Sequence, residues 1–542
     1  MSTLNDLPLQ EKEAFSLLKI LVTVFCIIAI RMPLDKLAYQ NTGDYFLPYE
    51  RAVHASLYYF SVFLSLSILA YFLTKVPFKN IFTFLTKIFI FILIVPLTDL
   101  VFHLTKTRPP IYLVIQMQDF LITFFKILNP FSGQGITFGQ HIGAYAIFIA
   151  LAIFVYKKTK SIFKSLISIF LGYVILFFDA IIPSIITALG NKNLAPGQSA
   201  TESYMLIIKN SWIVNAVKTA PLYLDNLFSQ LNTLNTWHEL VLARFFWILV
   251  TIEVVIIFFI ANKRLWNAFQ NNLRIERVAY WFIIATIGIV MNQKMFENVD
   301  LRNPINFISL LLFFMLIALN IWLAVFINDA EDIEIDAISN PDRPFVKKEI
   351  SSQEWHLMQI ILLILIVFGL ATLNNATAFL LLFAQAAYYI YSSRPLRLKR
   401  HFLFSSILIG FATVCVAMAG FFLVSPDQSF FAFPIKAIAI LGISYALLSN
   451  LKDIKDFEGD CYENMKTIPV VFGLENSKYI IASLCALTII AVPLVLKTYS
   501  ILFFSICVAL FLFYLFTKKK YQEKYIFLTI FLYIIILFAS AL

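Results

Sequence analysis

The sequence predicts an all-α protein, a polytopic bundle of transmembrane helices. Of its 542 residues, 60% are hydrophobic and 14% are charged, whereas about 25% of the residues of a soluble domain are charged. Apolar runs of about 20 residues, long enough for a helix to cross the ~30 Å hydrocarbon core, recur along the whole chain. The alternation typical of membrane β-barrels is missing from the sequence.

The apolar runs define about fifteen spans, separated by short polar clusters that mark the helix ends. The first run ends in "IAIRMPLDK" without a small-residue cleavage site, so we expect a retained anchor there. In chain order the predicted spans are 15–31, 53–75, 81–103, 138–156, 163–189, 243–261, 279–295, 305–327, 356–373, 377–392, 402–424, 432–450, 478–496, 499–517 and 525–541.

The charges between the spans predict the orientation. Lys and Arg collect in alternate connections, such as "YKKTK" at 156–160 and "RPLRLKR" at 394–400, while "LNNATA" at 373–378 has no positive charge. By the positive-inside rule, the N terminus and the basic loops face the cytoplasm of a cell membrane, and the C terminus lies outside. The net charge of +10 is therefore a topological signal, and we predict no nucleic-acid partner.

A polar segment, "NKRLWNAFQNNLRIERV" at 262–278, separates six spans from nine. We therefore expect two domains: a six-helix membrane module of unknown function at 1–262, and a nine-helix bundle at 263–542. Neither the five cysteines nor the six histidines form pairs with metal-ligand spacing, so a zinc site and a disulfide framework are not predicted.

The second domain contains an acidic pattern that occurs twice. Asp329, Asp332 and Asp336 are matched by Asp453, Asp456 and Asp460 at a constant offset, since 453 − 329, 456 − 332 and 460 − 336 all equal 124. Each set follows an apolar span and precedes a basic stretch that contains proline. The shared context indicates an internal duplication, and we expect the two sets to confront each other on the cytoplasmic side.

Carboxylates at helical spacing predict a cation site. Asn328, Asp332 and Asp336 are spaced at i, i+4 and i+8, and Asp456 and Asp460 at i and i+4, so each set shares one helix face. Like charges stacked in this way repel unless a cation lies among them. Sparse hard oxygen ligands suit Mg²⁺, which prefers one or two carboxylates together with the phosphates of a substrate.

The same residues carry a family resemblance. "NDAEDIEID" at 328–336 and "DFEGD" at 456–460 resemble the NDxxDxxxD and DxxxD motifs of the UbiA-type intramembrane prenyltransferases, a superfamily with nine transmembrane helices. The similarity extends to "YSSRPLRLKR" at 391–400 and covers about residues 274–542. It implies a Mg²⁺-dependent transfer of a polyprenyl group from a polyprenyl diphosphate to an acceptor. Within the family the acceptor is an aromatic quinone precursor, a prenylated glycerol phosphate, a tetrapyrrole or a phosphoribosyl diphosphate, and the motifs here are most similar to the first two branches.

The resemblance also implies roles for individual residues. The catalytic metal ligands would be Asn328, Asp332, Asp456 and Asp460, and Asp329, Asp336 and Asp453 would orient them or the substrate. Replacing either Asp332 or Asp456 by asparagine is expected to remove activity and to leave expression of the protein intact.

Basic residues on the same predicted membrane face fit a diphosphate. Arginine can grip phosphate oxygens bidentately, lysine acts as a point charge, and Tyr391 could shield a carbocation with its ring. The alternative for each basic residue is an anchor at a helix end. The candidates are Arg343, Arg394, Arg397 and Lys399.

Three other interpretations stay open at the level of sequence. A single acidic cluster could be a solvated loop. The whole protein could be a transporter or flippase that binds a phosphorylated lipid without transforming it. In the N-terminal module, Lys87, Asp99, Asp179 and Glu253 lie in or near predicted spans, with Glu253 the most central. They form either a polar site or ion path, or an interhelical pair of structural importance only.

Overall fold

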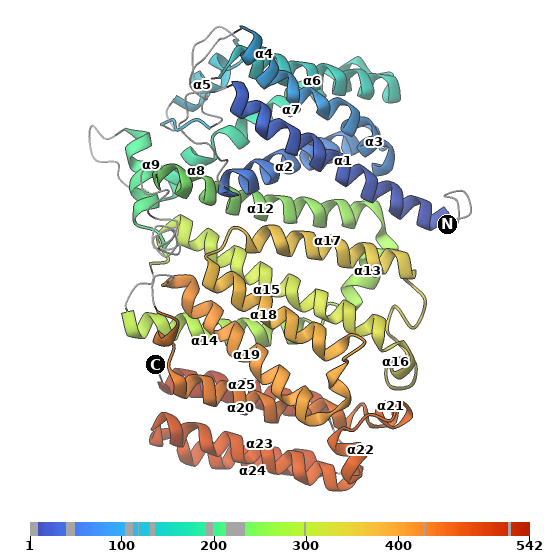
Figure 1. The fold of residues 1–542 in the computed structure, drawn as a ribbon, viewed down its shortest axis with the longest axis vertical. Coiled ribbons are helices and arrows are strands. Elements are labelled where there is room, and N and C mark those ends of the chain that lie inside the picture. Colours follow the sequence, from blue (N-terminus) through green and yellow to red (C-terminus); the bar gives the residue numbers. More distant parts are fainter. Residues whose placement is uncertain are drawn as a thin grey trace. The chain divides into compact units, whose positions relative to one another are not determined.

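Figure 1 shows the computed structural model of the chain, which describes residues 9–38, 49–102, 112–116, 119–129, 136–190, 199–212, 233–296, 300–425, 429–518 and 522–541. The fold is all-helical, as predicted. Over these ranges there is no β-strand, and only one isolated bridge, between His401 and Lys466, has β geometry.

The chain divides into two compact units. The N-terminal unit comprises Met1–Trp266, Asp300–Phe313 and Val367–Thr372, and the C-terminal unit comprises Asn267–Val299, Phe314–Ile366 and Leu373–Leu542. Contacts thus divide the chain after Trp266 and assign two later segments to the first unit. The domain boundary at 262 remains a prediction.

The helices up to residue 271 are α1 (Leu9–Ala38), α2 (Tyr49–Thr74), α3 (Phe78–Phe89), η1 (Ile90–Leu93), α4 (Ile94–Phe102), α5 (Phe120–Lys126), α6 (Phe138–Thr159), α7 (Ile162–Ala180), α8 (Ile182–Gly190), α9 (Ala200–Lys209), α12 (Thr233–Ala261) and α13 (Lys263–Asn271).

The later helices are α14 (Ile275–Phe296), α15 (Pro304–Glu331), α16 (Ile333–Ser339), α17 (Ser352–Leu370), α18 (Asn375–Ser392), η3 (Leu398–Arg400), α19 (Phe402–Val424), η4 (Phe430–Ala432), α20 (Ile435–Leu448), η5 (Ser449–Ile454), α21 (Phe457–Tyr462), α22 (Ile468–Phe472), α23 (Leu474–Leu496), η6 (Tyr499–Ile501), α24 (Leu502–Thr517) and α25 (Glu523–Ala541).

Each of the fifteen predicted spans contains helix, and eleven segments in the described part of the chain are long and apolar enough to cross a membrane. The count of fifteen spans stays a prediction. Two further apolar helices, Ile435–Leu451 and Lys524–Leu537, are shorter. The protein is therefore a multi-pass membrane protein. The predicted span at 163–189 is interrupted, because α7 ends at Ala180 and α8 starts at Ile182 with Pro183 in its first turn, where proline is tolerated.

In the N-terminal unit, α2 packs against α12 and α6 against α7. The buried guanidinium of Arg244 on α12 donates from Nε to the Thr372 carbonyl at 2.9 Å and from Nη1 to the Ser309 hydroxyl at 2.5 Å. Asn303 donates to the Ile207 carbonyl at 2.9 Å. These hydrogen bonds explain why two later segments of the chain belong to this unit.

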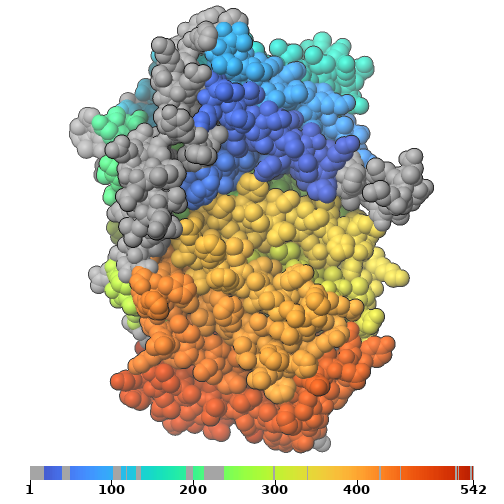
Figure 2. All heavy atoms as spheres, in the orientation of Figure 1, coloured from blue at the N-terminus to red at the C-terminus, as the bar shows by residue number. Residues whose placement is uncertain are grey.

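The C-terminal unit is organised around α19, which contacts α14, α18 and α20. Side chains fill the gaps between the ribbons of Figure 1, as the space-filling view in Figure 2 shows. At the α14–α19 crossing the backbones nearly touch: a Cβ on Gly288 would lie 1.8 Å from the Ala417 carbonyl oxygen, and a Cβ on Gly420 would lie 2.2 Å from that of Ala285. Only glycine fits at these two positions.

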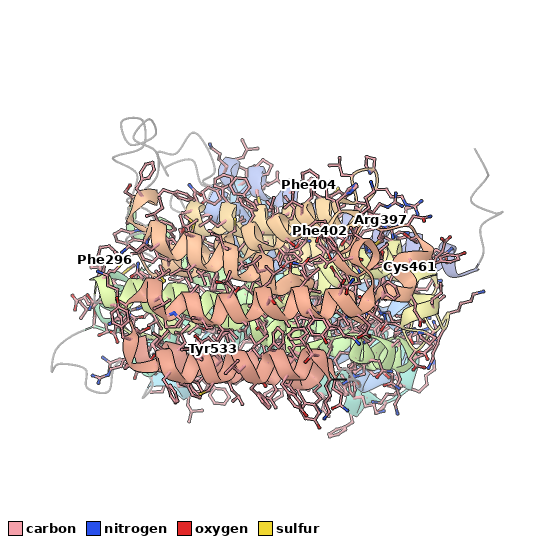
Figure 3. All side chains as sticks on the ribbon, turned by 90° about the horizontal axis from the view of Figure 1, so that it is seen from below. Phe296, Arg397, Phe402, Phe404, Cys461 and Tyr533 are labelled. Atoms are coloured by element: carbon pink, nitrogen blue, oxygen red, sulfur yellow. The ribbon has the colours of Figure 1, made fainter. Side chains whose placement is uncertain are left out.

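The loops that carry the acidic and basic motifs gather at one end of the C-terminal unit. In Figure 3, Arg397, Phe402 and Cys461 lie at this end, and Phe296 lies at the opposite end. Helices α15 and α18, together with the short helices that follow α20, deliver the motif residues there.

Candidate active site

The first acidic loop interrupts a long helix. Helix α15 ends at Glu331, and Asp332, with φ −106° and ψ 19°, starts α16. Backbone hydrogen bonds from Asp332 to Asn328 (3.0 Å) and from Asp336 to Asp332 (2.8 Å) continue across the break. The i, i+4 relation expected from the sequence is therefore kept, although the helix is not regular.

The second acidic loop repeats this local geometry. Asp456, with φ −86° and ψ 5°, starts α21, and the backbone N–H of Asp460 donates to its carbonyl at 2.9 Å. Asp332 and Asp456 each stand at the N-cap position of the short helix that follows. Neither makes a side-chain capping hydrogen bond, so neither carboxylate is used for capping. Helices α16 and α21 are in contact, so the two matched sets are neighbours.

Two cations neutralise Asp332. Arg397 donates from Nη2 to its Oδ1 at 2.8 Å, and the Lys399 ammonium contacts both of its carboxylate oxygens. All three side chains are buried, Arg397 with only 1% of its surface exposed. Burial alone raises the pKa of Asp332, but the charges of Lys399 and Arg397 outweigh this effect and hold the pKa below its ordinary value.

Asn328 lies beside this ion-pair cluster. Its side-chain oxygen accepts hydrogen bonds from the Lys399 ammonium at 3.0 Å and from the Ser392 hydroxyl at 3.1 Å. The ammonium of Lys399 therefore lies between the oxygens of Asn328 and Asp332, the two predicted ligands of one metal ion.

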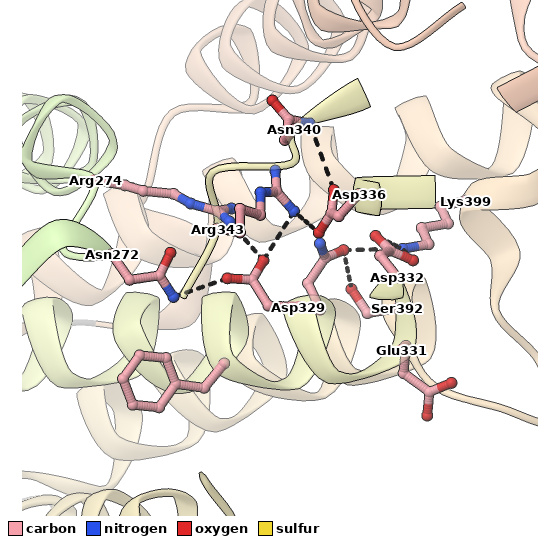
Figure 4. Close-up of polar contacts among 12 residues, drawn as sticks. Asn272, Arg274, Asp329, Glu331, Asp332, Asp336, Asn340, Arg343, Ser392 and Lys399 are labelled. Carbon is pink, nitrogen blue, oxygen red and sulfur yellow. Dashed lines mark hydrogen bonds and ion pairs between the residues drawn. The ribbon is translucent and has the colours of Figure 1, made fainter. Parts of the chain in front are cut away.

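Asp329 and Asp336 share a different cation. Arg343 donates from Nη1 to Asp329 at 3.1 Å and contacts the Asp336 carboxylate, while Arg274 and Asn272 also donate to Asp329 (Figure 4). Burial raises the pKa of Asp336 to about 6, because Arg343 offsets the effect only in part and the neighbouring aspartates add to it. Arg343 thus ties Asp329 to Asp336.

The basic loop joins the two acidic loops. Arg397 pairs with Asp332 of the first loop and, from Nη1, with Glu463 just after α21 at 2.8 Å. The backbone N–H of Lys466 donates to the Arg400 carbonyl at 2.7 Å, and that of Phe402 to the Lys466 carbonyl at 3.1 Å. These bonds hold the first acidic loop, the basic loop and the segment after α21 as one cluster.

The other candidates from the sequence lie around the same cluster. Asp453 and Asp460 are buried, and Asp456 is partly exposed. Arg394 is exposed, with its Nε 3.5 Å from the Glu331 carboxylate, so its guanidinium faces the aqueous side of the loops. The remaining candidate, the ring of Tyr391, is buried at the end of α18.

An aromatic cluster lies further along α18, inside the C-terminal unit. The ring of Trp281 from α14 lies 5.6 Å from that of Tyr388 and 5.7 Å from that of Tyr445 on α20. The Tyr388 hydroxyl and, one turn earlier on α18, the side-chain oxygen of Gln385 are buried and have no hydrogen-bond partner. Buried polar atoms are normally paired, so these two atoms are candidates for contact with a ligand.

The donor set fits a metal ion that binds together with a phosphorylated substrate. Among the residues that the structure describes, no group of three or more His, Cys, Asp or Glu side chains could hold an ion alone. Magnesium takes one or two carboxylates and completes its shell with water and phosphate oxygens. The ammonium between Asn328 and Asp332 demonstrates that a cation fits that position.

Several residues of this cluster were missed in the sequence. Glu463, Ser392, Asn272 and Arg274 contact motif residues, yet each lies outside the acidic and basic patterns or far from its partner along the chain. Gln385, which lies near the aromatic cluster on α18, was missed as well, although it has a local signal: a polar residue one turn from tyrosine in an apolar helix.

The fold is that of a multi-pass membrane protein, and its paired acidic loops meet basic side chains at one end of a helical bundle. Residues 279–535 match the model of the UbiA prenyltransferase family. Residues 279–535 are therefore a UbiA prenyltransferase domain, and the resemblance and the enzyme class predicted from the motifs are confirmed.

Similar proteins include the digeranylgeranylglyceryl phosphate synthase of Methanobrevibacter smithii, 27% identical over 219 residues, which are 39% of this chain and 73% of that protein. The chlorophyll synthase of Avena sativa is 29% identical over 220 residues, 37% of this chain and 56% of that protein. A solved structure of a UbiA homologue from Archaeoglobus fulgidus bound to GPP and Mg²⁺ aligns at 21% identity with a TM-score of 0.40, over 51% of this chain and 98% of that chain.

Proposed function

We propose that the C-terminal unit transfers a polyprenyl group from a polyprenyl diphosphate to a small-molecule or lipid acceptor, with Mg²⁺ as the cofactor. The observation that carries this proposal is the contact between α16 and α21, reinforced by Arg397 between Asp332 and Glu463. Two carboxylate sets held together in this way suit one diphosphate with metal ions on both sides of it.

Asn328 and Asp332 would hold one ion, and Asp456 and Asp460 would hold the other. Bound Mg²⁺ would supply positive charge to stabilise the departing diphosphate. Asp329 and Asp336 are already bound by Arg343, so they orient this arginine and do not compete for metal. Asp453, buried beside the second loop, would position that loop in the same way.

The basic residues would bind the diphosphate oxygens. Arg394 is exposed beside the acidic loops and is available to a phosphate. Lys399 would exchange its contact with Asp332 for a contact with the diphosphate once metal neutralises the carboxylate. Arg397, shared between Asp332 and Glu463, would keep the loops in register, and Arg343 would add positive charge from the first loop.

In the reaction the bond between C1 of the prenyl group and the diphosphate oxygen breaks, and pyrophosphate leaves with the electron pair. The acceptor nucleophile forms a bond to C1 and loses a proton. Positive charge that develops on the allylic group can be stabilised by aromatic ring faces. We assign this role to three rings: Tyr391, buried at the end of α18, and Tyr388 and Trp281, which lie further inside.

The acceptor would bind next to Gln385 and Tyr388. An acceptor with a hydroxyl or other polar group would pair with the two unbonded oxygens, which otherwise stay buried at a cost. The names of the two similar proteins point to different products, a prenylated glyceryl phosphate and chlorophyll, so both lipid and ring acceptors belong in a test. With the predicted orientation, diphosphate would be released on the cytoplasmic side of the cell membrane.

The experiment is to incubate the purified protein with a prenyl diphosphate, Mg²⁺ and a panel of acceptors, and to measure pyrophosphate release. Release that requires Mg²⁺ and is lost in Asp456→Asn supports the enzyme. Binding of the donor without release, under conditions in which the acceptors are also bound, would favour a carrier of phosphorylated lipids and refute the proposal.

A further inference from the structure

A row of polar side chains lies along α2 in the N-terminal unit, where this helix packs against α12. Arg51, His54, Tyr58, Ser61 and Ser65 follow one another at spacings of three and four, so they form one stripe of the helix. His54 and Ser61 are buried. Apolar packing alone does not require such a stripe in a membrane helix.

One end of this stripe is fully engaged in polar contacts. The carboxylate of Glu239, near the start of α12, contacts the ring nitrogen Nδ1 of His54 through Oε2. Its Oε1 accepts a hydrogen bond from Nε of Arg51 at 3.4 Å. The other ring nitrogen of His54 contacts the hydroxyl of the buried Tyr112. Tyr112 in turn lies against Tyr58, with 6.1 Å between the ring centroids.

The other end of the stripe reaches Glu253, fourteen residues further along α12 (253 − 239). Its Oε1 accepts hydrogen bonds from the Ser61 hydroxyl at 3.2 Å and from the Ser65 hydroxyl, whereas its Oε2 is buried and has no partner. Asp179, at the end of α7, also has a buried, unpartnered oxygen, Oδ2. Helix α7 packs against α2, and the charge of Asp179 acts on both Glu253 and Tyr58.

This carboxylate pair has no cationic partner among the residues that the structure describes. Within the described residues, no ion pair joins Asp179 or Glu253, only 6% and 3% exposed, to a lysine or arginine. The charge of Arg31 reaches Tyr58, but its Nε pairs with Asp35 at 3.0 Å and its Nη1 donates to a backbone carbonyl. Lys87, the lysine that the sequence placed in a nearby span, is exposed.

The physical consequence is that the pair cannot hold two negative charges. One charge inside a span costs about 2.5 kcal/mol or more, and a second like charge nearby costs more. The two serine hydroxyls satisfy one oxygen of Glu253 and leave the other available for a proton. Tyr58, Tyr112 and His54 provide titratable groups between this pair and Glu239.

We propose that the N-terminal unit binds a proton on the Asp179–Glu253 pair, at the inner end of a polar seam formed by α2 and α12. The seam connects this proton site to the His54–Glu239 cluster near the start of both helices. A protonatable carboxylate with such a connection is the element that proton-coupled transport requires. This site is independent of prenyl transfer.

The test uses dicyclohexylcarbodiimide, an apolar reagent that modifies protonated carboxyl groups in apolar surroundings. The purified full-length protein is treated over a range from mildly acidic to mildly alkaline pH, and modified peptides are quantified by mass spectrometry. We expect modification of Glu253 or Asp179 that declines at least tenfold across this range as the pH rises. Glu253→Gln, which has no carboxyl at position 253, identifies the share of the labelling that belongs to Glu253. Glu202, exposed on α9, is the internal control that this reagent should not modify.

A second variant covers the case in which Glu253→Gln does not fold. In the double variant Ser61→Ala with Ser65→Ala, the ionised carboxylate loses both hydrogen bonds, so modification should persist to higher pH. A profile identical to that of the native protein contradicts the proposal. So does an absence of modification at both carboxyls over the whole range. Modification that slows when sodium replaces choline at constant pH identifies sodium as the ligand and also overturns it.

Discussion

Asp332→Asn and Asp456→Asn are expected to differ in stability although both remove activity. Asp332 is the partner of Arg397 and Lys399, whose side chains are 1% and 7% exposed. Removing one partner of a buried ion pair typically costs about 3–5 kcal/mol. Asparagine keeps one oxygen as a hydrogen-bond acceptor, so we expect a loss of about 3 kcal/mol, at the lower end of this range.

Asp456 is partly exposed and makes no capping hydrogen bond to its helix. Its replacement by asparagine should change the free energy of unfolding by no more than about 0.5 kcal/mol. The assay is unfolding of both purified variants in detergent without Mg²⁺, together with pyrophosphate release. Equal stability of the two variants would refute the assignment of Asp332 as the counter-ion of a buried cluster, and retained turnover in Asp456→Asn would refute its role at the diphosphate.

Three other outcomes follow from the same contacts. A double-mutant cycle of Arg397→Met and Glu463→Gln should give a coupling energy of about 0.5–3 kcal/mol, and additive effects would exclude their pairing. Lys399→Met should slow turnover, and it should tighten Mg²⁺ binding in the absence of the prenyl donor, because the ammonium that competes with the ion is removed. Calorimetric titration measures this affinity, and an unchanged value would argue against the competition. Gly288→Ala should lower the unfolding temperature far more than Gly442→Ala, because the Cβ at position 442 would meet no atom closer than 3.3 Å. Similar unfolding temperatures for the two variants would contradict the close approach of α14 and α19.

The acidic loops were predictable because their pattern is local. Each set contains two aspartates four residues apart, and the sets are offset by 124 residues. In the structure each set has a short helix with an aspartate, Asp332 or Asp456, at its N-cap position. The all-helical fold followed equally directly from the length and apolar character of the spans. Even the interruption between α7 and α8 has its signal in the sequence, at Pro183.

The partners of the motif residues were not predictable in the same way. Lys399 is 67 residues from Asp332, and Glu463 is 66 residues from Arg397 (463 − 397), so no periodicity within one helix relates them. The sequence predicted these cations as phosphate ligands, and the structure shows two of them on Asp332. Without a ligand, buried cations and carboxylates satisfy each other, and only coordinates reveal which ones meet.

The glycine contact between α14 and α19 has a consequence for how this enzyme can diversify. At Gly288 and Gly420 the backbones of the two helices are in direct contact, and no side chain separates them. Single substitutions therefore cannot change the spacing of these helices in small steps. Helices α18 and α20, which carry Tyr388 and Tyr445 into the interior, keep that freedom. Descendants that accept bulkier or smaller molecules should therefore have changed on α18 and α20 and should retain both glycines.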